Sequence, residues 1–163
     1  MKEAELNTII RNTLKDGWGF GYKISDKGGG AQQRRPFDGM GLYQDRVIFW
    51  EAKQSRGVTA FNLKTLFEGE RGHQMETFET LYQKRILTSE DTGGLWVIYG
   101  CSIPRAHRVY VFEYEVLRKL YRKSGITSIH KKTLETLPHA TITKKRLVDI
   151  QVIRELEEIQ NDA

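Results

Sequence analysis

The sequence lacks the features that define several protein classes. It has one cysteine, Cys101, in 163 residues, which excludes a disulfide framework within the chain and a zinc site built on cysteines. No apolar run approaches the length of a membrane-spanning helix, and the first residues, MKEAELNTII, contain no apolar segment of a secretory signal. We therefore expect a cytoplasmic protein that does not bind a membrane.

Composition indicates a folded chain of one domain. Hydrophobic residues make up 39% of the sequence and charged residues 29%, which is typical of globular proteins and not of disordered ones. We expect a single domain over residues 1–163, with a core over about 1–122 and a basic C-terminal extension over about 123–163. One domain of this length has room for a substantial hydrophobic core.

Positive charge is concentrated in the second half of the chain. The formal net charge is +5, yet residues 118–146 alone contain nine Lys or Arg residues against one acid, Glu135, a local balance of +8. Such a segment suits a polyanion, because phosphate contacts supply most non-specific affinity for nucleic acids. The alternative is a solvated face on a basic protein.

Hydrophobic periodicity predicts alternating helices and strands. The expected helices cover residues 2–16, 68–88, 115–123 and 144–159, and the expected strands cover residues 17–25, 37–43, 46–54, 95–101 and 108–114. A tight turn at Gln44 and Asp45 should join the second and third strands. This order predicts an α/β fold with a mixed central β-sheet flanked by helices.

The hairpin at residues 37–54 concentrates charge beside apolar residues. Glu51 and Lys53 follow VIFW and, being two residues apart on a strand, point to the same side. With the turn at residues 44–45, Asp38 lies directly opposite Glu51, with Cβ atoms about 5 Å apart. Two carboxylates at this distance repel each other unless a cation lies between them, and the Ala52 carbonyl is a further oxygen ligand nearby. Mg²⁺ prefers such oxygen ligands.

The spacing Asp-x₁₂-Glu-x-Lys resembles the pattern of the PD-(D/E)xK nuclease superfamily. Pro36 precedes Asp38 by two residues, and Gln54 follows Lys53. The segment FDGMGLYQDRVIFWEAKQSRGVTAFNLKTLFEGERGHQMETF resembles the centre of RecU-type Holliday junction resolvases. EAELNTIIRNTL resembles the first helix of archaeal-type resolvases. Because only DKGGGAQQRR stands where RecU-type proteins have a long stalk, the chain is most similar in this part to the short resolvases of phages and archaea.

The resemblance implies a restriction-endonuclease-like core and a Mg²⁺-dependent crossover junction endonuclease, with Mn²⁺ as a substitute. Asp38, Glu51 and the Ala52 carbonyl would hold the metal, Lys53 would act on the scissile phosphate and its attacking water, and Glu3 would complete the catalytic site. Glu3 shares the inward face of its helix with Leu6 and Ile10, so it is preferred over Glu5. The implied partners are a DNA four-way junction and a second copy of the chain in a C2 homodimer.

Six further residues are predicted to contact DNA: Lys27, Arg34, Arg35, Gln54, His73 and Gln74. The first three lie in or beside the glycine-rich loop DKGGGAQQRR, and His73 and Gln74 lie where helix N–H groups can hold a phosphate. The simpler alternatives are a solvated connector and a polar helix start. For the whole protein, the alternatives are another nuclease of the same superfamily, restriction-like or for repair, and a DNA-binding module without catalysis.

Overall fold

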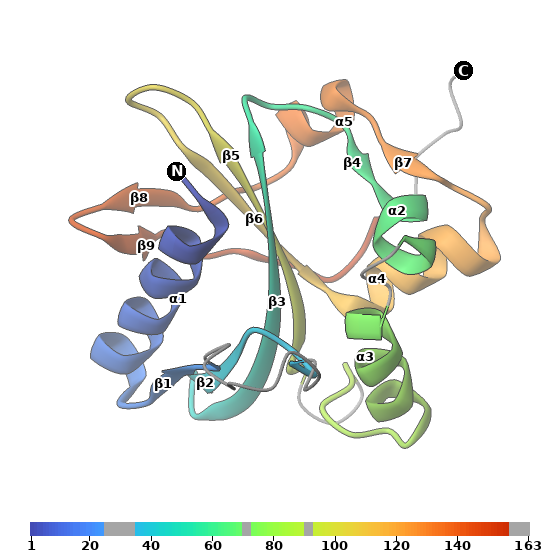
Figure 1. Cartoon of the computed structure of the whole chain (residues 1–163), viewed down its shortest axis with the longest axis horizontal. Helices are drawn as coiled ribbons and strands as arrows, with labels where there is room; N and C mark the ends of the chain where they lie inside the picture. The colour runs from blue at the N-terminus through green and yellow to red at the C-terminus, as the bar shows by residue number, and fades with distance from the viewer. Residues whose placement is uncertain (25–34, 70–72, 90–92, 157–163) are drawn as a thin grey trace.

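The structure is a computed structural model that describes residues 1–24, 35–69, 73–89 and 93–156. In this part of the chain a six-stranded sheet forms the centre, in the order β1-β2-β3-β5-β6-β10 (Figure 1). The β3–β5 and β6–β10 pairs are parallel and the others antiparallel. The predicted α/β class with a mixed sheet is confirmed. The strands are β1 Gly21–Lys23, β2 Gly39–Tyr43, β3 Arg46–Arg56, β5 Leu95–Ser102, β6 Arg108–Glu113 and β10 Val152–Ile153.

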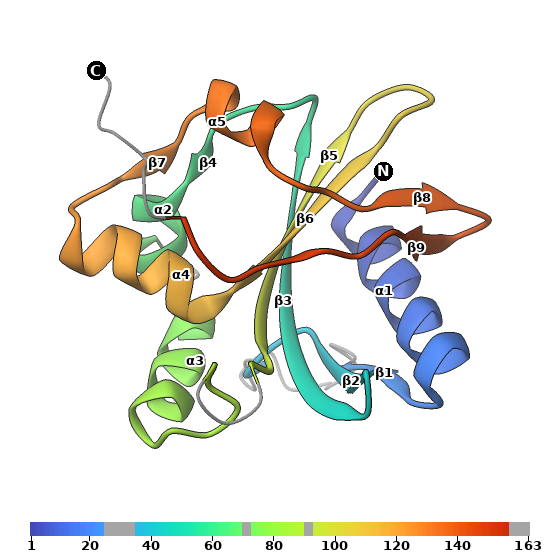
Figure 2. The same ribbon diagram turned by 180° about the vertical axis from the view of Figure 1, so that it is seen from behind.

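Helices cover both faces of this sheet. The first helix lies on one side together with a small hairpin of β8 and β9, and the remaining helices lie on the other side (Figures 1 and 2). None of the helices in the described residues is long and apolar enough to cross a membrane. The bounds are α1 Glu3–Trp18, α2 Leu63–Glu68, α3 His73–Gln83, α4 Tyr114–Arg118, the π-helical turn η1 Lys119–Lys123 and α5 Lys131–Thr136; the short strands are β4 Phe61–Asn62, β7 Ser128–Ile129, β8 Thr141–Thr143 and β9 Arg146–Val148.

Two hydrophobic cores sandwich the sheet. On the α1 side, Leu6, Ile10 and Leu14 pack against strand residues that include Trp50 and Trp96. On the opposite side, a larger set of residues from β5, β6 and α2–α5 forms the second core. Both cores are fully buried at their centres, so the middle strands β3 and β5 are held rigidly from both faces.

The β2–β3 hairpin has the predicted register. Gly39 pairs with Trp50 and Tyr43 with Arg46, so that Asp38, just before β2, comes opposite Glu51. The two turn residues, Gln44 and Asp45, have φ angles of 51° and 61°, as a two-residue type I′ turn requires. Gly39 is needed here because a Cβ atom at this position would overlap the indole of Trp50.

The predicted helix over residues 144–159 is wrong. Residues 146–148 form β9, and residues 152–153 form β10 at the edge of the central sheet, parallel to β6. Leu147 is buried against α1, and its N–H donates to Thr13 Oγ1 at 2.8 Å. The apolar spacing of this segment therefore reflects separate contacts of short strands, and not one face of a helix.

Two other predicted elements have different bounds. Only Gly21–Lys23 of the expected strand over 17–25 is a described strand, because α1 continues to Trp18 and ends at Gly19, whose φ is 92°. The expected helix over 68–88 is α3, His73–Gln83, with the separate helix α2 before it. The predicted strands at 95–101 and 108–114 and the helical segment at 115–123 agree closely with β5, β6 and α4–η1.

Candidate metal centre

Three carboxylates from distant parts of the sequence meet beside β3. Glu3 is the first residue of α1, Asp38 precedes β2, and Glu51 lies in the middle of β3. One carboxylate oxygen from each lies within 4.8 Å of the other two. Asp38 and Glu51 are completely buried. Glu5 is exposed and lies outside this group. Of the two acids in the first turn of α1, the structure therefore places Glu3 beside Asp38 and Glu51, as helical periodicity predicted.

The backbone holds Asp38 in a fixed position. Its N–H donates to the Trp50 carbonyl at 2.9 Å, and its own carbonyl accepts from Ile24 N at 2.8 Å. Its Oδ2 accepts a 2.8 Å hydrogen bond from the Ala52 N–H. The other oxygen, Oδ1, lies 3.3 Å from Arg35 Nη2 in an ion pair and takes part in no regular hydrogen bond among the described residues.

Glu51 is a buried acid without compensating donors. Neither of its carboxylate oxygens accepts a hydrogen bond from a described residue. Burial raises the pKa of Glu51 to about 10; the neighbouring Asp38 carboxylate adds to the rise, and the charge of Lys53 opposes it. The protonated Glu51 can donate to Asp38, whereas the ionised form needs a cation. Without a cation, burying an ionised carboxylate that accepts no hydrogen bond costs so much folding free energy that the group stays protonated.

These donors fit a hard divalent cation. All three are carboxylates, the residue type that Mg²⁺ and Mn²⁺ prefer, and three of their buried oxygens (Asp38 Oδ1, Glu51 Oε1 and Oε2) have no described hydrogen-bond partner. Ala52 contributes its N–H to Asp38, and its carbonyl stays a predicted ligand. Glu3, Asp38 and Glu51 are hereafter called the acidic triad.

Lys53 and Gln54 extend the site along β3. Lys53 lies on the same side of the strand as Glu51, is half-buried, and is close enough for its charge to lower the pKa of Glu51. Gln54 Nε2 donates to Ser102 Oγ at 2.8 Å on the neighbouring strand β5. Both residues line a cleft that also includes Glu3, so the predicted catalytic lysine opens onto the same cavity as one member of the acidic triad.

One positioning residue was missed by sequence reasoning. Asn7 is buried on α1, and its Oδ1 accepts a 2.9 Å hydrogen bond from Trp50 Nε1. Asn7 lies one helical turn after Glu3, and Trp50 directly precedes Glu51. The signal available in the sequence was a polar residue beside Leu6 on the apolar face of the first helix.

The predicted DNA-binding residues have different outcomes. Lys27 and Arg34 lie outside the described residues, as do the side chains of His73 and Gln74, although the backbone of α3 begins at His73. Arg35 is directed into the site, where it donates to the Ile24 carbonyl at 3.2 Å and pairs with Asp38. In this structure the Arg35 guanidinium therefore contacts other residues of the same chain.

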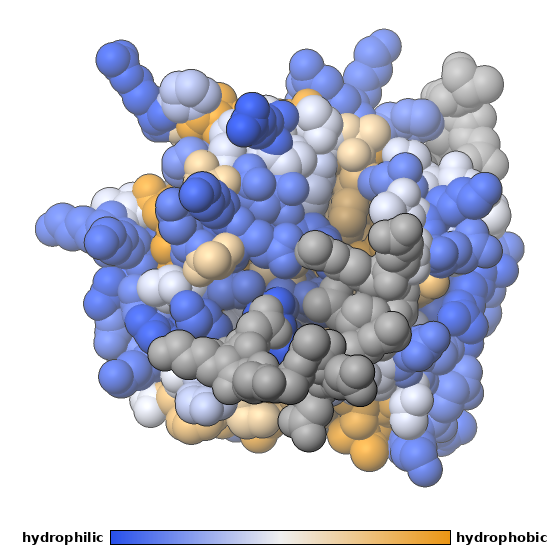
Figure 3. All heavy atoms as spheres, in the orientation of Figure 1, coloured by the Kyte–Doolittle hydropathy of each residue, from blue (hydrophilic) through white to orange (hydrophobic). Residues whose placement is uncertain are grey.

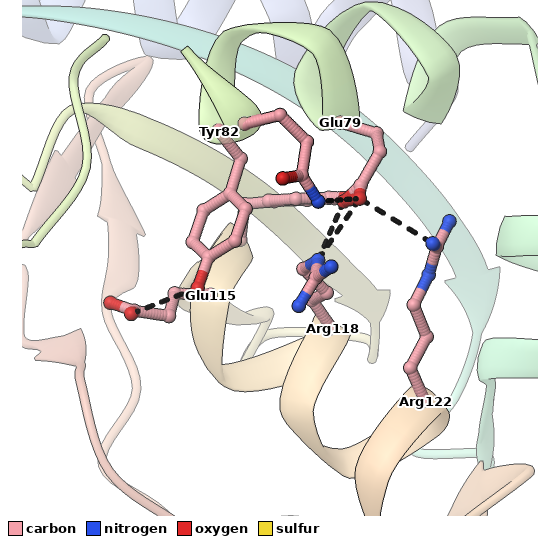
Figure 4. A network of polar contacts seen from close by, with 7 residues as sticks. Glu79, Tyr82, Glu115, Arg118 and Arg122 are labelled. Atoms are coloured by element: carbon pink, nitrogen blue, oxygen red, sulfur yellow. Dashed lines mark hydrogen bonds and ion pairs between the residues drawn. The ribbon is translucent and has the colours of Figure 1, made fainter. Parts of the chain in front are cut away.

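Part of the basic segment 118–146 also contacts protein acids. Arg118 Nε donates to Glu79 at 2.6 Å, and Arg122 lies 3.4 Å from the same carboxylate (Figure 4). Tyr114 also donates to Glu79, at 3.0 Å. These contacts lower the pKa of Glu79, although its burial opposes them. The network ties α3 to α4, and it reduces the positive charge that this segment offers to a polyanion.

Other basic residues of the segment lie at a strained turn. Lys144 and Lys145 join β8 to β9 with φ angles of 52° and 60°, a conformation that favours Gly or Asn. The next residue, Arg146, forms an ion pair with Asp16 of α1. The hairpin thus presents two lysines beside the first helix.

Comparison with known proteins adds no further assignment. No protein-family model matches the chain, and a search of curated proteins finds no significant relative.

Proposed function

We propose that this protein is a metal-dependent DNA endonuclease with a restriction-endonuclease-like core, which resolves four-way junctions by paired phosphodiester hydrolysis. The observation that carries the proposal is the acidic triad, in which one carboxylate oxygen of each residue lies within 4.8 Å of the other two, with Lys53 lining one cleft together with Glu3. A buried carboxylate such as Glu51, whose two oxygens have no hydrogen-bond partner among the described residues, is rare in a structural role and is typical of a site that binds a cation.

The residues have distinct roles in this mechanism. Glu3, Asp38 and Glu51 would hold Mg²⁺ or Mn²⁺, with the Ala52 carbonyl as a further ligand. When bound, the metal supplies positive charge at the phosphate and lowers the pKa of a water molecule. The Lys53 ammonium orients the attacking water or stabilises the negative charge that develops on the phosphate oxygens. Hydrolysis would leave a 5′-phosphate and a 3′-hydroxyl.

The position of the triad supports a strand-cleaving role. Asp38 directly precedes β2 and Glu51 lies on β3 of the same hairpin, so their separation is fixed by backbone hydrogen bonds. A preorganised site of this kind does not have to rearrange when charge develops. Because a four-way junction needs two symmetric cuts, the proposal includes a C2 homodimer with one site in each subunit. We expect the protein to act in the cytoplasm, where its DNA substrate would be found.

Cleavage assays test this function. A synthetic four-way junction and a linear duplex of the same sequence are incubated with the protein, with and without Mg²⁺. We expect paired nicks near the branch point of the junction, only with metal. Asp38→Asn should bind the junction in EDTA as wild type does but leave it uncut when Mg²⁺ is added, since the swap removes charge and little volume.

Two outcomes would contradict the proposal in different ways. Equal cleavage of the linear duplex would assign the protein to restriction-like or repair nucleases with the same site. Junction binding without cleavage in Mg²⁺ or Mn²⁺ would indicate a binding module without catalysis.

A further inference from the structure

A cleft of about 560 Å³ adjoins the acidic triad. It begins at Glu3 and Lys53 and extends past Thr59 and Phe61 to Thr65 on α2. In the space-filling view, an apolar area lies among hydrophilic residues in the region of β4 (Figure 3). The volume is in the usual range for sites that bind a small organic molecule, about 300–1,000 Å³. We hereafter call it the β4–α2 cleft.

The charge of this cleft is unusual for a site next to a phosphate. Glu3 and Lys53 belong to the metal centre, and the rest of the described lining carries no charged side chain. A phosphate group placed deeper in the cleft would therefore meet no counter-ion. The cleft instead suits an uncharged portion of the substrate.

Hydroxyl groups form one wall. Ser55 Oγ and Thr59 Oγ1 are 2.9 Å apart, and Thr59 Oγ1 lies 3.0 Å from Tyr99 Oη. Such hydroxyls both donate and accept hydrogen bonds. Ser55 Oγ donates to the Gly57 carbonyl at 2.9 Å and Tyr99 Oη donates to the Thr59 carbonyl at 3.0 Å, so this wall offers mainly acceptor oxygens to a ligand.

Aromatic and amide groups also line the cleft. Phe61 stacks on Tyr99, with ring centroids 4.3 Å apart and an interplanar angle of 6°, and each residue is only 4% exposed, so the pair forms a rigid floor beneath the cleft. Asn62 Oδ1 accepts from the Thr65 N–H at 2.9 Å, so the Asn62 amide group offers its N–H donors to a ligand. An uncharged, partly apolar lining with both acceptor oxygens and amide donors is the chemistry that recognises the polar edge of a nucleobase.

We propose that the β4–α2 cleft receives one unpaired nucleoside, base and deoxyribose, from the strand that is cut, next to the scissile phosphate. This inference rests on the proposed function and specifies its substrate. A base inside continuous duplex is stacked on both faces, and it must be unstacked and unpaired, at a cost in free energy, before it can enter such a cavity. At a branch point, a nucleotide leaves its stack at a lower cost. The lower cost of unstacking a nucleotide at a branch point would thus make the active site itself select branched DNA over linear duplex.

Fluorescence of 2-aminopurine tests the inference with wild-type protein in EDTA, where DNA is bound and left uncut. The probe replaces the base on either side of the mapped cleavage position in a four-way junction. Ala60→Trp fills the cleft from an exposed position on its lining, and Ala106→Trp adds the same side chain at an exposed position on the β5–β6 loop. Thr65→Trp is a second cleft-filling variant, for use if Ala60→Trp does not fold.

We expect wild type and Ala106→Trp to raise the fluorescence several-fold at one of the two positions, because the base leaves its stack. The cleft-filling variants should give no rise and should cut the junction at least tenfold more slowly, with unchanged metal affinity. Junction cleavage by wild type without any rise would overturn the inference and leave the proposed function standing. Equal rise and cleavage in Ala60→Trp and Ala106→Trp would also overturn it. A wild type that cuts no junction would contradict the proposed function itself.

Discussion

Trp50 Nε1 donates a 2.9 Å hydrogen bond to Asn7 Oδ1, and both side chains are buried between α1 and β3. This hydrogen bond fixes the position of α1, along the helix axis, relative to β3. Since Glu3 lies one turn before Asn7 and Glu51 directly follows Trp50, the same bond sets the separation of two acids of the triad. A single buried contact thereby connects the packing of the first helix to the geometry of the metal centre.

Asn7→Ala should weaken both stability and metal binding. The Trp50 N–H would lose its partner, which lowers the free energy of unfolding by about 1–3 kcal/mol. The concentration of Mn²⁺ needed for half-saturation should rise several-fold, because Glu3 is less well positioned. Denaturant unfolding and metal titration measure the two effects, with Asn12→Ala on the same helix as the control. Lower stability with unchanged metal affinity would show that Asn7 has a structural role alone.

Glu51→Gln should stabilise the metal-free protein at high pH. The folded-state pKa of Glu51, about 10, lies above its ordinary value of 4.5. Between these values the folded state binds more protons than the unfolded state does, so stability falls as pH rises. Removing the acid should therefore raise the unfolding free energy in EDTA by about 1–3 kcal/mol at pH 8 and have little effect at pH 4.

Thermal unfolding of wild type and Glu51→Gln across this pH range measures the difference. Glu5→Gln, at the exposed acid of the same region, is the control for loss of one negative charge. If Glu51→Gln destabilised the protein equally at pH 4 and pH 8, the burial of an uncompensated acid would not be the cause.

Lys53→Ala should slow cleavage and leave DNA affinity nearly unchanged. Loss of one charge that stabilises the transition state typically lowers turnover about 10²-fold or more. Single-turnover cleavage and junction binding in EDTA separate the two quantities. Lys84→Ala removes the same charge from an exposed position after α3 and should behave as wild type. A large loss of affinity with normal turnover would make Lys53 a binding residue.

Arg35→Ala should strengthen metal binding. The Arg35 guanidinium lies 3.3 Å from Asp38 Oδ1, where it competes with a cation for the same oxygen. Removing a partly exposed ion pair of this kind is worth about 0.5–1 kcal/mol, so half-saturation should occur at an about twofold to fivefold lower Mn²⁺ concentration. Weaker junction binding with unchanged metal affinity would instead support the DNA contact predicted from the sequence.

The acidic hairpin could be predicted from sequence because its signals are local. A two-residue turn at Gln44 and Asp45 sets the pairing, and strand periodicity then places Asp38 opposite Glu51. A glutamate of the first helix was implied by the resemblance to archaeal-type resolvases, and helical periodicity then favoured Glu3 over Glu5. The strand pairing and the helical face each depend only on the geometry of one hairpin or one element, and the structure has the same arrangement.

The remaining features depend on tertiary contacts. Leu147 and Ile153 have helical spacing but are buried against different elements, α1 and the edge of the sheet. The β4–α2 cleft is built from a two-residue strand and a six-residue helix, which are too short to have a periodicity. The ion pair of Arg35 with Asp38 places a predicted DNA-binding residue within the site, and no sequence pattern distinguishes the two roles.

Calorimetric titration of Mn²⁺ into the metal-free protein tests the metal centre most directly. We predict saturable binding by wild type and Glu5→Gln, and its loss in Asp38→Asn and Glu51→Gln. Because Glu51 holds a proton at neutral pH when metal is absent, binding should also release protons, seen as an enthalpy that depends on the ionisation enthalpy of the buffer. Equal saturable binding by Glu51→Gln, or no binding by wild type, would contradict the assignment of the acidic triad as a metal centre.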